Sequence, residues 1–311
     1  MAEDNRRLAQ MLEMFRALDV PHGTGDTAIP GFHTYRYEQE MPLSCSTGDL
    51  ACSLILSGEK SVSMGAREIV YHTGESLLCG ASVPNVYRAL GVSKENPFLS
   101  FALILDRSLL MELAEGLPMP AGEAAAPEAV TVFHANDDLL EDFERLLKLL
   151  ANPEQIPVRA PLVIRDIHYL LLTGPTGASL MPLLRDAAPA GAIIRAVSWL
   201  KKNFRSSFTI EELARMHNMS TSNFHRQFKL VTGMTPLQFQ KQLRLFEAQR
   251  LMLDTGGQVA EAAYAVGYES STQFVREYKR QFGESPLRDI RRRRLAFASL
   301  PCAESCPDQA A

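Results

Sequence analysis

The sequence predicts an α+β protein of two domains: an N-terminal β-sandwich or β-barrel with helices, and an all-helical C-terminal domain. Three observations predict this class. Short apolar or β-branched segments alternate with turn residues between residues 32 and 105. A helical pattern repeats itself between residues 210 and 286. The 311 residues, 46% hydrophobic and 22% charged, suffice for about two ordinary domains.

The first two thirds of the chain mix helical and strand patterns. Apolar residues at helical spacing predict a helix over Glu3–Leu18, and later helices over Asp137–Leu150 and Ala160–Leu172. The leucine-rich stripe of Asp137–Leu150 indicates either a core or a dimer seam. Between these helices the predicted strands are Phe32–Tyr37, Ser53–Leu56, Ser61–Met64, Glu68–Tyr71, Ser76–Cys79, Val86–Leu90 and Phe98–Leu105.

Composition predicts the domain boundaries. Residues 174–189 hold several prolines and glycines and indicate a linker, so we expect a first domain over 1–185 and a second over 190–294. The small, polar segment 295–311 is typical of a disordered tail.

Charge separates the two predicted domains. Residues 189–294 hold 18 Lys and Arg against 9 Asp and Glu, whereas the rest of the chain holds 14 against 27. The net charge of −4 is therefore the sum of a basic and an acidic part, and the basic part favours nucleic acid as a partner. The sequence offers no apolar run long enough to cross a membrane and no secretory signal, so we expect a cytoplasmic protein.

The repeat places similar residues in register. Residues 210–220 align with 259–269 at an offset of 49, which becomes 50 after one inserted residue. The matched pairs are Phe224 with Phe274, Arg226 with Arg276, Phe228 with Tyr278, Lys229 with Lys279, Gly233 with Gly283, and Pro236 with Pro286. Two copies are too few for a solenoid, so we infer a duplicated small module.

Each copy has the pattern of a helix-turn-helix unit. In the first, Thr209 and Glu212 form a capping box, Asn218 suits a left-handed turn, and Ser220 suits the start of the next helix. Gly233 is typical of the end of that helix. Between the copies the pattern predicts one helix over residues 236–254, which would hold both units on one face of DNA.

The second helix of such a unit enters the major groove of DNA. Side chains off the core stripe are then candidate contacts: Ser222, Asn223, His225, Arg226 and Lys229 in the first copy, and Ser271, Thr272, Val275, Arg276 and Lys279 in the second. Arginine binds guanine in a bidentate manner, whereas lysine suits phosphate, which sets register without reading sequence. We count the scattered charge of a plain helical bundle as the less favoured interpretation.

Residues 190–294 resemble the AraC/XylS family of bacterial transcription regulators. The segments that carry the likeness are 220–236 (STSNFHRQFKLVTGMTP) and 267–286 (GYESSTQFVREYKRQFGESP). The resemblance implies that Ser222, His225, Arg226, Ser271, Thr272, Val275 and Arg276 contact bases. Val275 departs from a polar base reader, and a thymine methyl group is its expected target.

Residues 1–185 resemble the N-terminal half of one AraC subgroup, through segments such as 54–60 (LILSGEK) and 74–78 (GESLL). That resemblance implies a cupin-like β-barrel that senses a small-molecule effector, helices for homodimer formation, and RNA polymerase as a partner of the regulator on promoter DNA. It also slightly favours a dimer seam over a core for the leucine-rich stripe of Asp137–Leu150. The effector, the target genes and the choice between activation and repression stay open.

Other functions have less support in the sequence. A cupin-type enzyme with an accessory DNA-binding tail is the alternative, but His33, His72 and His134 lie too far apart for a metal site, so we expect no catalytic residues, metal or cofactor. A sequence-nonspecific DNA binder is a third hypothesis. A thiol sensor at Cys45, Cys52 or Cys79 is conceivable, although packing is the favoured role. Residues 291–294 suggest a solvated basic helix end.

Overall fold

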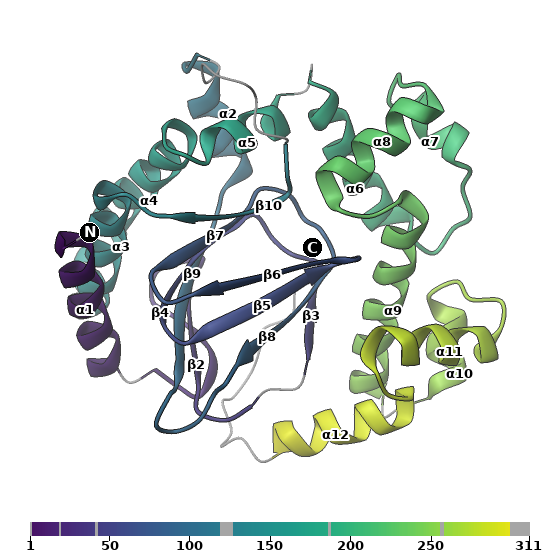
Figure 1. Ribbon diagram of the computed structural model, residues 1–311, viewed down its shortest axis with the longest axis horizontal. Helices are drawn as coiled ribbons and strands as arrows, with labels where there is room; N and C mark the ends of the chain where they lie inside the picture. The colour runs from purple at the N-terminus through teal and green to yellow at the C-terminus, as the bar shows by residue number, and fades with distance from the viewer. Residues whose placement is uncertain are drawn as a thin grey trace. The chain divides into compact units, whose positions relative to one another are not determined.

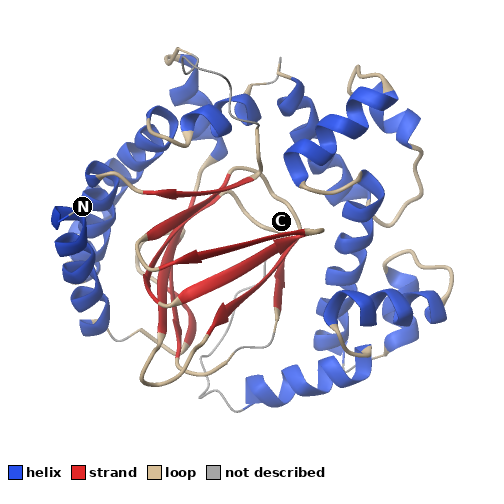
Figure 2. Cartoon of the chain, viewed as in Figure 1, coloured by secondary structure: helices blue, strands red, loops and turns tan. Residues whose placement is uncertain are grey.

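The computed structural model describes residues 2–18, 20–40, 43–118, 127–185, 188–255 and 258–298. Contacts divide the chain into two compact units, residues 1–243 and 244–311. The first contains both β-sheets and most of the helices, and the described part of the second is helical (Figures 1 and 2). The linker and the two domains that the sequence predicts stay predictions, although residues 177–184 of that linker form a helix.

Two antiparallel sheets lie at the centre of the first unit (Figure 2). The larger has the strand order β1-β2-β9-β4-β7-β10, and the smaller has the order β3-β8-β5-β6. The strands are β1 (Gly23–Asp26), β2 (Phe32–Tyr37), β3 (Ser44–Ser46), β4 (Ala51–Ser57), β5 (Glu59–Met64), β6 (Arg67–His72), β7 (Glu75–Cys79), β8 (Asn85–Leu90), β9 (Phe98–Ile104) and β10 (Val130–His134).

The predicted barrel is a two-sheet structure, because the strand pairings described leave the six-stranded and four-stranded sheets separate. All seven predicted strands are present. The sequence analysis missed β1, β3 and β10, which are short or partly polar and lie near turns. β3 and β10 are paired by strands distant in sequence, which a local pattern does not predict, whereas β1 pairs with the next strand, β2, and lacks the apolar alternation that predicts a strand.

The inner faces of the two sheets pack together. Ile55 of β4, Leu77 of β7 and Val62 of β5 belong to one buried apolar cluster. The hydroxyls of Ser53 in β4 and Tyr71 in β6 lie 3.3 Å apart across the sheets. Side chains alternate between the two faces of a strand, so the neighbours of these residues in sequence point outward.

Helices cover the outer face of the six-stranded sheet (Figure 1). Phe101 of β9 packs against Phe143, with ring centroids 5.0 Å apart, and Met11 and Phe15 belong to the same cluster. The helices of this part of the chain are α1 (Ala2–Ala17), α2 (Arg107–Glu115), α3 (Asp137–Leu150), the 3₁₀ turn η1 (Pro153–Gln155), α4 (Ile156–Thr173) and α5 (Gly177–Leu184).

The leucine stripe of α3 is core. Leu139, Leu140 and Leu147 are each 2% exposed, and Phe143 and Leu146 are fully buried. The sequence prediction of a dimer seam on this stripe is therefore wrong, because α1, α4 and the sheet already cover the apolar face. An apolar helix stripe predicts burial, but the sequence does not say whether the covering surface belongs to the same chain.

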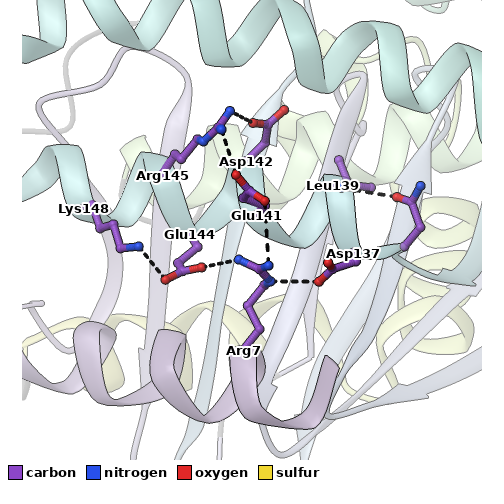
Figure 3. Close-up of polar contacts among 9 residues, drawn as sticks. Arg7, Asp137, Leu139, Glu141, Asp142, Glu144, Arg145 and Lys148 are labelled. Carbon is purple, nitrogen blue, oxygen red and sulfur yellow. Dashed lines mark hydrogen bonds and ion pairs between the residues drawn. The ribbon is translucent and has the colours of Figure 1, made fainter. Parts of the chain in front are cut away.

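The polar face of α3 is joined to α1 by ion pairs (Figure 3). Arg7 lies 2.9 Å from Asp137 and 2.6 Å from Glu144, and Lys148 lies 2.6 Å from the other oxygen of Glu144. Burial raises the pKa of Glu144, but the hydrogen bonds from Lys148 and Arg7 outweigh it and hold that pKa below its ordinary value. The contacts of Arg7 fix the N-terminal helix against α3.

The remaining helices carry the repeat. They are α6 (Pro189–Asn203), α7 (Ile210–Met216), α8 (Thr221–Thr232), α9 (Pro236–Thr255), α10 (Val259–Ala265), α11 (Ser271–Phe282) and α12 (Pro286–Ala298). The single helix expected between the two copies is α9, which begins in the first compact unit and ends in the second. No described helix is long and apolar enough to span a bilayer.

Candidate nucleic-acid interface

The first helix-turn-helix unit consists of α7, a tight turn and α8. Thr209 and Glu212 form the predicted capping box: the Thr209 hydroxyl accepts from the Glu212 backbone N–H at 3.2 Å, and Glu212 accepts from the Thr209 backbone N–H at 2.9 Å. Asn218 has a φ of 56° and turns the chain. Ser220 then caps α8 by accepting from the backbone N–H of Asn223. Local side-chain bonds thus define both ends of the turn.

The second unit repeats this construction with α10 and α11. Gly267 takes the turn position with a φ of 91°, where a glycine has no strain. Ser270 caps α11 by accepting from the backbone N–H of Gln273. Gly233 and Gly283 end α8 and α11 in the left-handed conformation, as predicted. The two recognition helices therefore have matching starts and ends.

The core stripes of the recognition helices are buried as expected. Phe224 and Phe228 of α8 are fully buried, with ring centroids 5.7 Å apart. Phe274 and Tyr278 of α11 are fully buried as well, at 5.5 Å. Because a helix turns once in 3.6 residues, these stripes determine which side chains point away from the core.

The predicted contact residues lie off these stripes. Exposed side chains are Ser222, His225, Arg226 and Lys229 on α8, and Thr272, Arg276 and Lys279 on α11. Asn223, Ser271 and Val275 are half-buried. Arg226 and Arg276 occupy corresponding places on the two helices, which the repeat predicts. The contact of each of these residues with DNA stays a prediction.

Arg226 has a local partner. Its guanidinium donates to the amide oxygen of Asn223 at 3.0 Å, one helical turn earlier. This bond aligns the arginine along the exposed face of α8 and uses one of its five donors, so others stay available for a base edge. The pair can thus present a planar donor group to guanine.

A buried polar network holds α11 in the second compact unit. Asp289 of α12 is fully buried and accepts from Tyr278 and from Gln249 of α9, both at 2.7 Å. It also pairs with Arg293 at 2.9 Å. Burial raises the pKa of Asp289, but the hydrogen bond from Tyr278 and the charge of Arg293 outweigh it, so the pKa lies below its ordinary value. The network ties the recognition helix to both neighbouring helices.

This network corrects the interpretation of the basic segment 291–294. Arg293 is 6% exposed and bonded to Asp289, so it is a structural residue and not part of a solvated end. Arg291, Arg292 and Arg294 are exposed. The sequence carried no signal for this difference, because the carboxylate that pairs with Arg293 could equally have faced water.

The thiols of Cys52 and Cys79 in the large sheet do not ionise readily. Burial raises the pKa of Cys52, and burial raises the pKa of Cys79 to about 11. Both thiols are therefore protonated at neutral pH, and the packing role fits them better than a reactive sensor. No disulfide joins Cys45, Cys52 and Cys79 in the described part of the chain, and Cys302 and Cys306 lie outside the described residues. Within the described ranges, no three His, Cys, Asp or Glu side chains are grouped as metal ligands.

The sheets and the two capped helix-turn-helix units define a two-part protein with a duplicated nucleic-acid-binding motif. A family model described as the AraC-type transcriptional regulator N-terminus matches residues 28–179, and one for a helix-turn-helix domain matches residues 213–293. The chain belongs to the AraC/XylS family of transcriptional regulators, as the sequence resemblance implies.

Known proteins are similar to part of this chain. The HTH-type transcriptional activator RhaS of Escherichia coli O1:K1 / APEC is 29% identical over 168 residues, which are 53% of this chain and 59% of that relative. The corresponding RhaS of Salmonella schwarzengrund is 28% identical over 171 residues. The chain thus matches about three fifths of the length of these curated relatives, at 59%.

A solved structure supports the fold over most of the chain. Unsaturated fatty acid bound ToxT from Vibrio cholerae has a TM-score of 0.54, covers 84% of this chain and 95% of its own, and is 11% identical. At that identity the likeness concerns the fold alone. It includes the two-part α+β architecture.

Proposed function

We propose that this protein is a sequence-specific DNA-binding transcriptional regulator that responds to a small-molecule effector through its N-terminal sheets. The observation that carries the proposal is the pair of capped recognition helices with exposed arginines, Arg226 and Arg276, at corresponding places. Two such helices in one chain suit an asymmetric DNA site with two half-sites about one helical turn apart. Membership of the AraC/XylS family supports the same function.

Arginine truncation tests the base-reading role. The wild-type chain first selects a duplex from a random library, and its affinity for that duplex is measured by gel shift at fixed salt. We expect Arg226→Ala and Arg276→Ala each to weaken binding by about 1–3 kcal/mol and to relax specificity at one position. Arg16→Ala is the matched control, because Arg16 is an exposed helical arginine of α1, away from the recognition helices in sequence.

A second measurement separates specific from nonspecific binding. Competition with random duplex leaves most of a specific complex intact, whereas a nonspecific binder exchanges freely and shows only a salt-dependent affinity. Equal affinity of the wild type and both arginine variants for the selected duplex would overturn the base-reading proposal.

We propose a route for the effector response inside the first compact unit. The backbone N–H of Ala129, next to β10, donates to the carbonyl of Val231 near the end of α8 at 2.9 Å. β10 pairs with β7, where Val130 lies opposite Cys79 on the large sheet. A ligand that moves β7 can therefore bias the first recognition helix, provided that it binds the two positions with different affinity.

We propose that the homodimer forms through α4. Val158, Leu162 and Tyr169 of α4 are 71%, 66% and 43% exposed, and their spacing of four and seven residues places them along one stripe. Three large apolar side chains on one exposed stripe favour a second helix as their cover. α4 thus replaces α3 as the candidate seam.

Sedimentation tests this seam. Leu162→Glu is expected to shift the chain from dimer to monomer at micromolar concentration, because a charge in an apolar seam is costly. Leu287→Glu, at a residue 63% exposed on α12, is the control and should leave the mass unchanged. A wild-type monomer, or a dimeric Leu162→Glu variant, would overturn the assignment.

RNA polymerase stays a proposed partner. An activator of this class would recruit or contact polymerase when its DNA site lies near a promoter. Reconstituted transcription from a template that carries the selected duplex, with and without the protein, tests this partner and distinguishes activation from repression.

A further inference from the structure

We infer that the inner faces of the two sheets bind a small organic carboxylate, with Lys60 of β5 as the group that binds its charge. Lys60, Tyr35 and Tyr87 are half-buried and not fully buried, so solvent reaches this part of the inner faces. The site is made by Lys60 with Tyr35, Ser53, Tyr71, Cys79 and Tyr87. The inference deepens the proposed function and rests on it, since it names the chemical class of the effector. Three observations carry it: the direction of Lys60, its lack of an acidic partner, and the polarity of its surroundings.

Lys60 points into the interior. In the sheet register Lys60 lies opposite Tyr71 of β6, and directly opposed residues share a face. Tyr71 is fully buried and its hydroxyl lies 3.3 Å from that of Ser53 in the other sheet. The face shared by Lys60 and Tyr71 is therefore the inner one.

Aromatic rings hold the ammonium group from both sheets. The Nζ atom of Lys60 lies 4.4 Å from the ring centroid of Tyr87 in β8 and 5.6 Å from that of Tyr35 in β2. Cation–π contacts of this kind stabilise the charge only in part. The rings thus place the cation without neutralising it.

Lys60 has no acidic partner. Its contacts within the described residues are these two rings and the electrostatic influence of Cys79, with no carboxylate among them. The neighbouring Glu59 is paired with His72 instead, at 3.2 Å. Burial lowers the pKa of Lys60 to about 8, which is the response of an ammonium that lacks a counter-charge. A carboxylate would supply that charge.

The remaining groups suit the rest of such a ligand. The hydroxyls of Ser53 and Tyr71 can each donate to a carboxylate oxygen, while the Cys79 thiol stays neutral. The buried side chains of Ile55, Val62 and Leu77 belong to the same cluster and provide an apolar wall. One cation, a few hydroxyl donors and aromatic walls match an acid with a small apolar body better than a sugar or a cation.

Calorimetric titration of the full chain with sodium benzoate tests the inference. Benzamide has the same ring without the charge, and sodium chloride at equal ionic strength controls for screening. We expect benzoate to bind and benzamide to bind at least about tenfold more weakly, because a hydrogen bond to a charged group contributes the most.

Two variants assign the binding to Lys60. Lys60→Met should weaken benzoate binding about tenfold or more, and Lys60→Arg should restore part of it, because it keeps the charge. Lys94→Met is the matched control at an exposed lysine and should bind like the wild type. Melting curves of each variant without ligand check the fold, and removal of a half-buried ammonium without an acidic partner should not lower the melting temperature.

The outcomes are distinct from those of the DNA experiment. Three results would each overturn the carboxylate site. The first is that the wild type does not bind benzoate up to 20 mM, which is about the weakest affinity of interest for an effector. The others are that benzamide binds as well as benzoate, or that Lys60→Met binds benzoate like the wild type. Affinity of the same samples for the selected duplex without acid then reports separately on the proposed DNA-binding function.

Discussion

Replacement of Asp142 by asparagine should stabilise the protein above pH 6. Asp142 is 2% exposed on α3. Arg145 donates to its Oδ1 atom at 3.0 Å, while its Oδ2 atom is buried without a hydrogen-bond partner. Burial, and then the negative charge of Asp166 on α4, raise the pKa of Asp142 to about 6 despite Arg145. The ionised carboxylate is thus unfavourable in the folded state.

The magnitude follows from the pKa. The ordinary value is 3.8, and each pKa unit corresponds to about 1.4 kcal/mol, so ionised Asp142 costs about 3 kcal/mol relative to its protonated form. Asparagine keeps an acceptor for Arg145 but loses about 1 kcal/mol of charge attraction to that half-exposed guanidinium. We expect Asp142→Asn to raise the free energy of unfolding by about 1–2 kcal/mol at pH 7.5.

The effect of Asp142→Asn on the free energy of unfolding depends on pH. Because the folded pKa of Asp142 is raised, the contribution of this one group to stability is fully present below about pH 4, its ordinary pKa, and is lost as pH rises through about 6. Urea unfolding at several pH values, followed by the fluorescence of the sole tryptophan, Trp199, measures both chains. Asp166→Asn is the companion variant and should give a smaller gain. A variant less stable than wild type at pH 7.5, or an unchanged pH dependence, would refute the reasoning.

Three further changes probe the DNA-binding helices. Tyr278→Phe removes a donor to buried Asp289 and should cost about 1–3 kcal/mol in the second compact unit; unchanged hydrogen exchange of α11 amides would contradict this. Ser220→Ala removes the cap of α8 and should cost about 1 kcal/mol in thermal unfolding, so an unaltered melting curve speaks against the cap. Gly283→Ala meets no atom within 4 Å but has a φ of +79°, so backbone strain alone should cost about 1 kcal/mol, whereas Gly116→Ala, at a φ of −84°, should be neutral in the same measurement.

Local signals explain the success of the sequence analysis at several elements. The bounds of β2 and α3 agree with prediction, because each has a strong apolar period and clear residues at its ends. The capping box at Thr209 and the glycines at the ends of α8 and α11 are also as predicted. In these cases the residue that determines the local structure lies within four residues of the backbone groups that it affects.

Partners distant in sequence explain the failures. β3 and β10 exist because β8 and β7 pair with them, and α5 forms inside the expected linker, where Leu180 and Leu183 are buried. The apolar stripe of α3 is buried for the same reason, since α1, α4 and the large sheet cover it. An apolar face indicates that something covers it, but only the fold identifies the cover.

The sequence by itself determined that the chain has two helix-turn-helix units with arginines in register, because a repeat is a property of order along the chain. Only the tertiary structure decided which charged side chains are buried. Arg293 and Arg276 are alike in sequence, yet Arg293 is paired inside the fold with Asp289 and Arg276 is exposed. In the sequence Lys60 looks like any exposed lysine of a strand, and only the fold shows that it faces the second sheet. Burial of a charge depends on desolvation by residues far along the chain, and no local pattern contains that information.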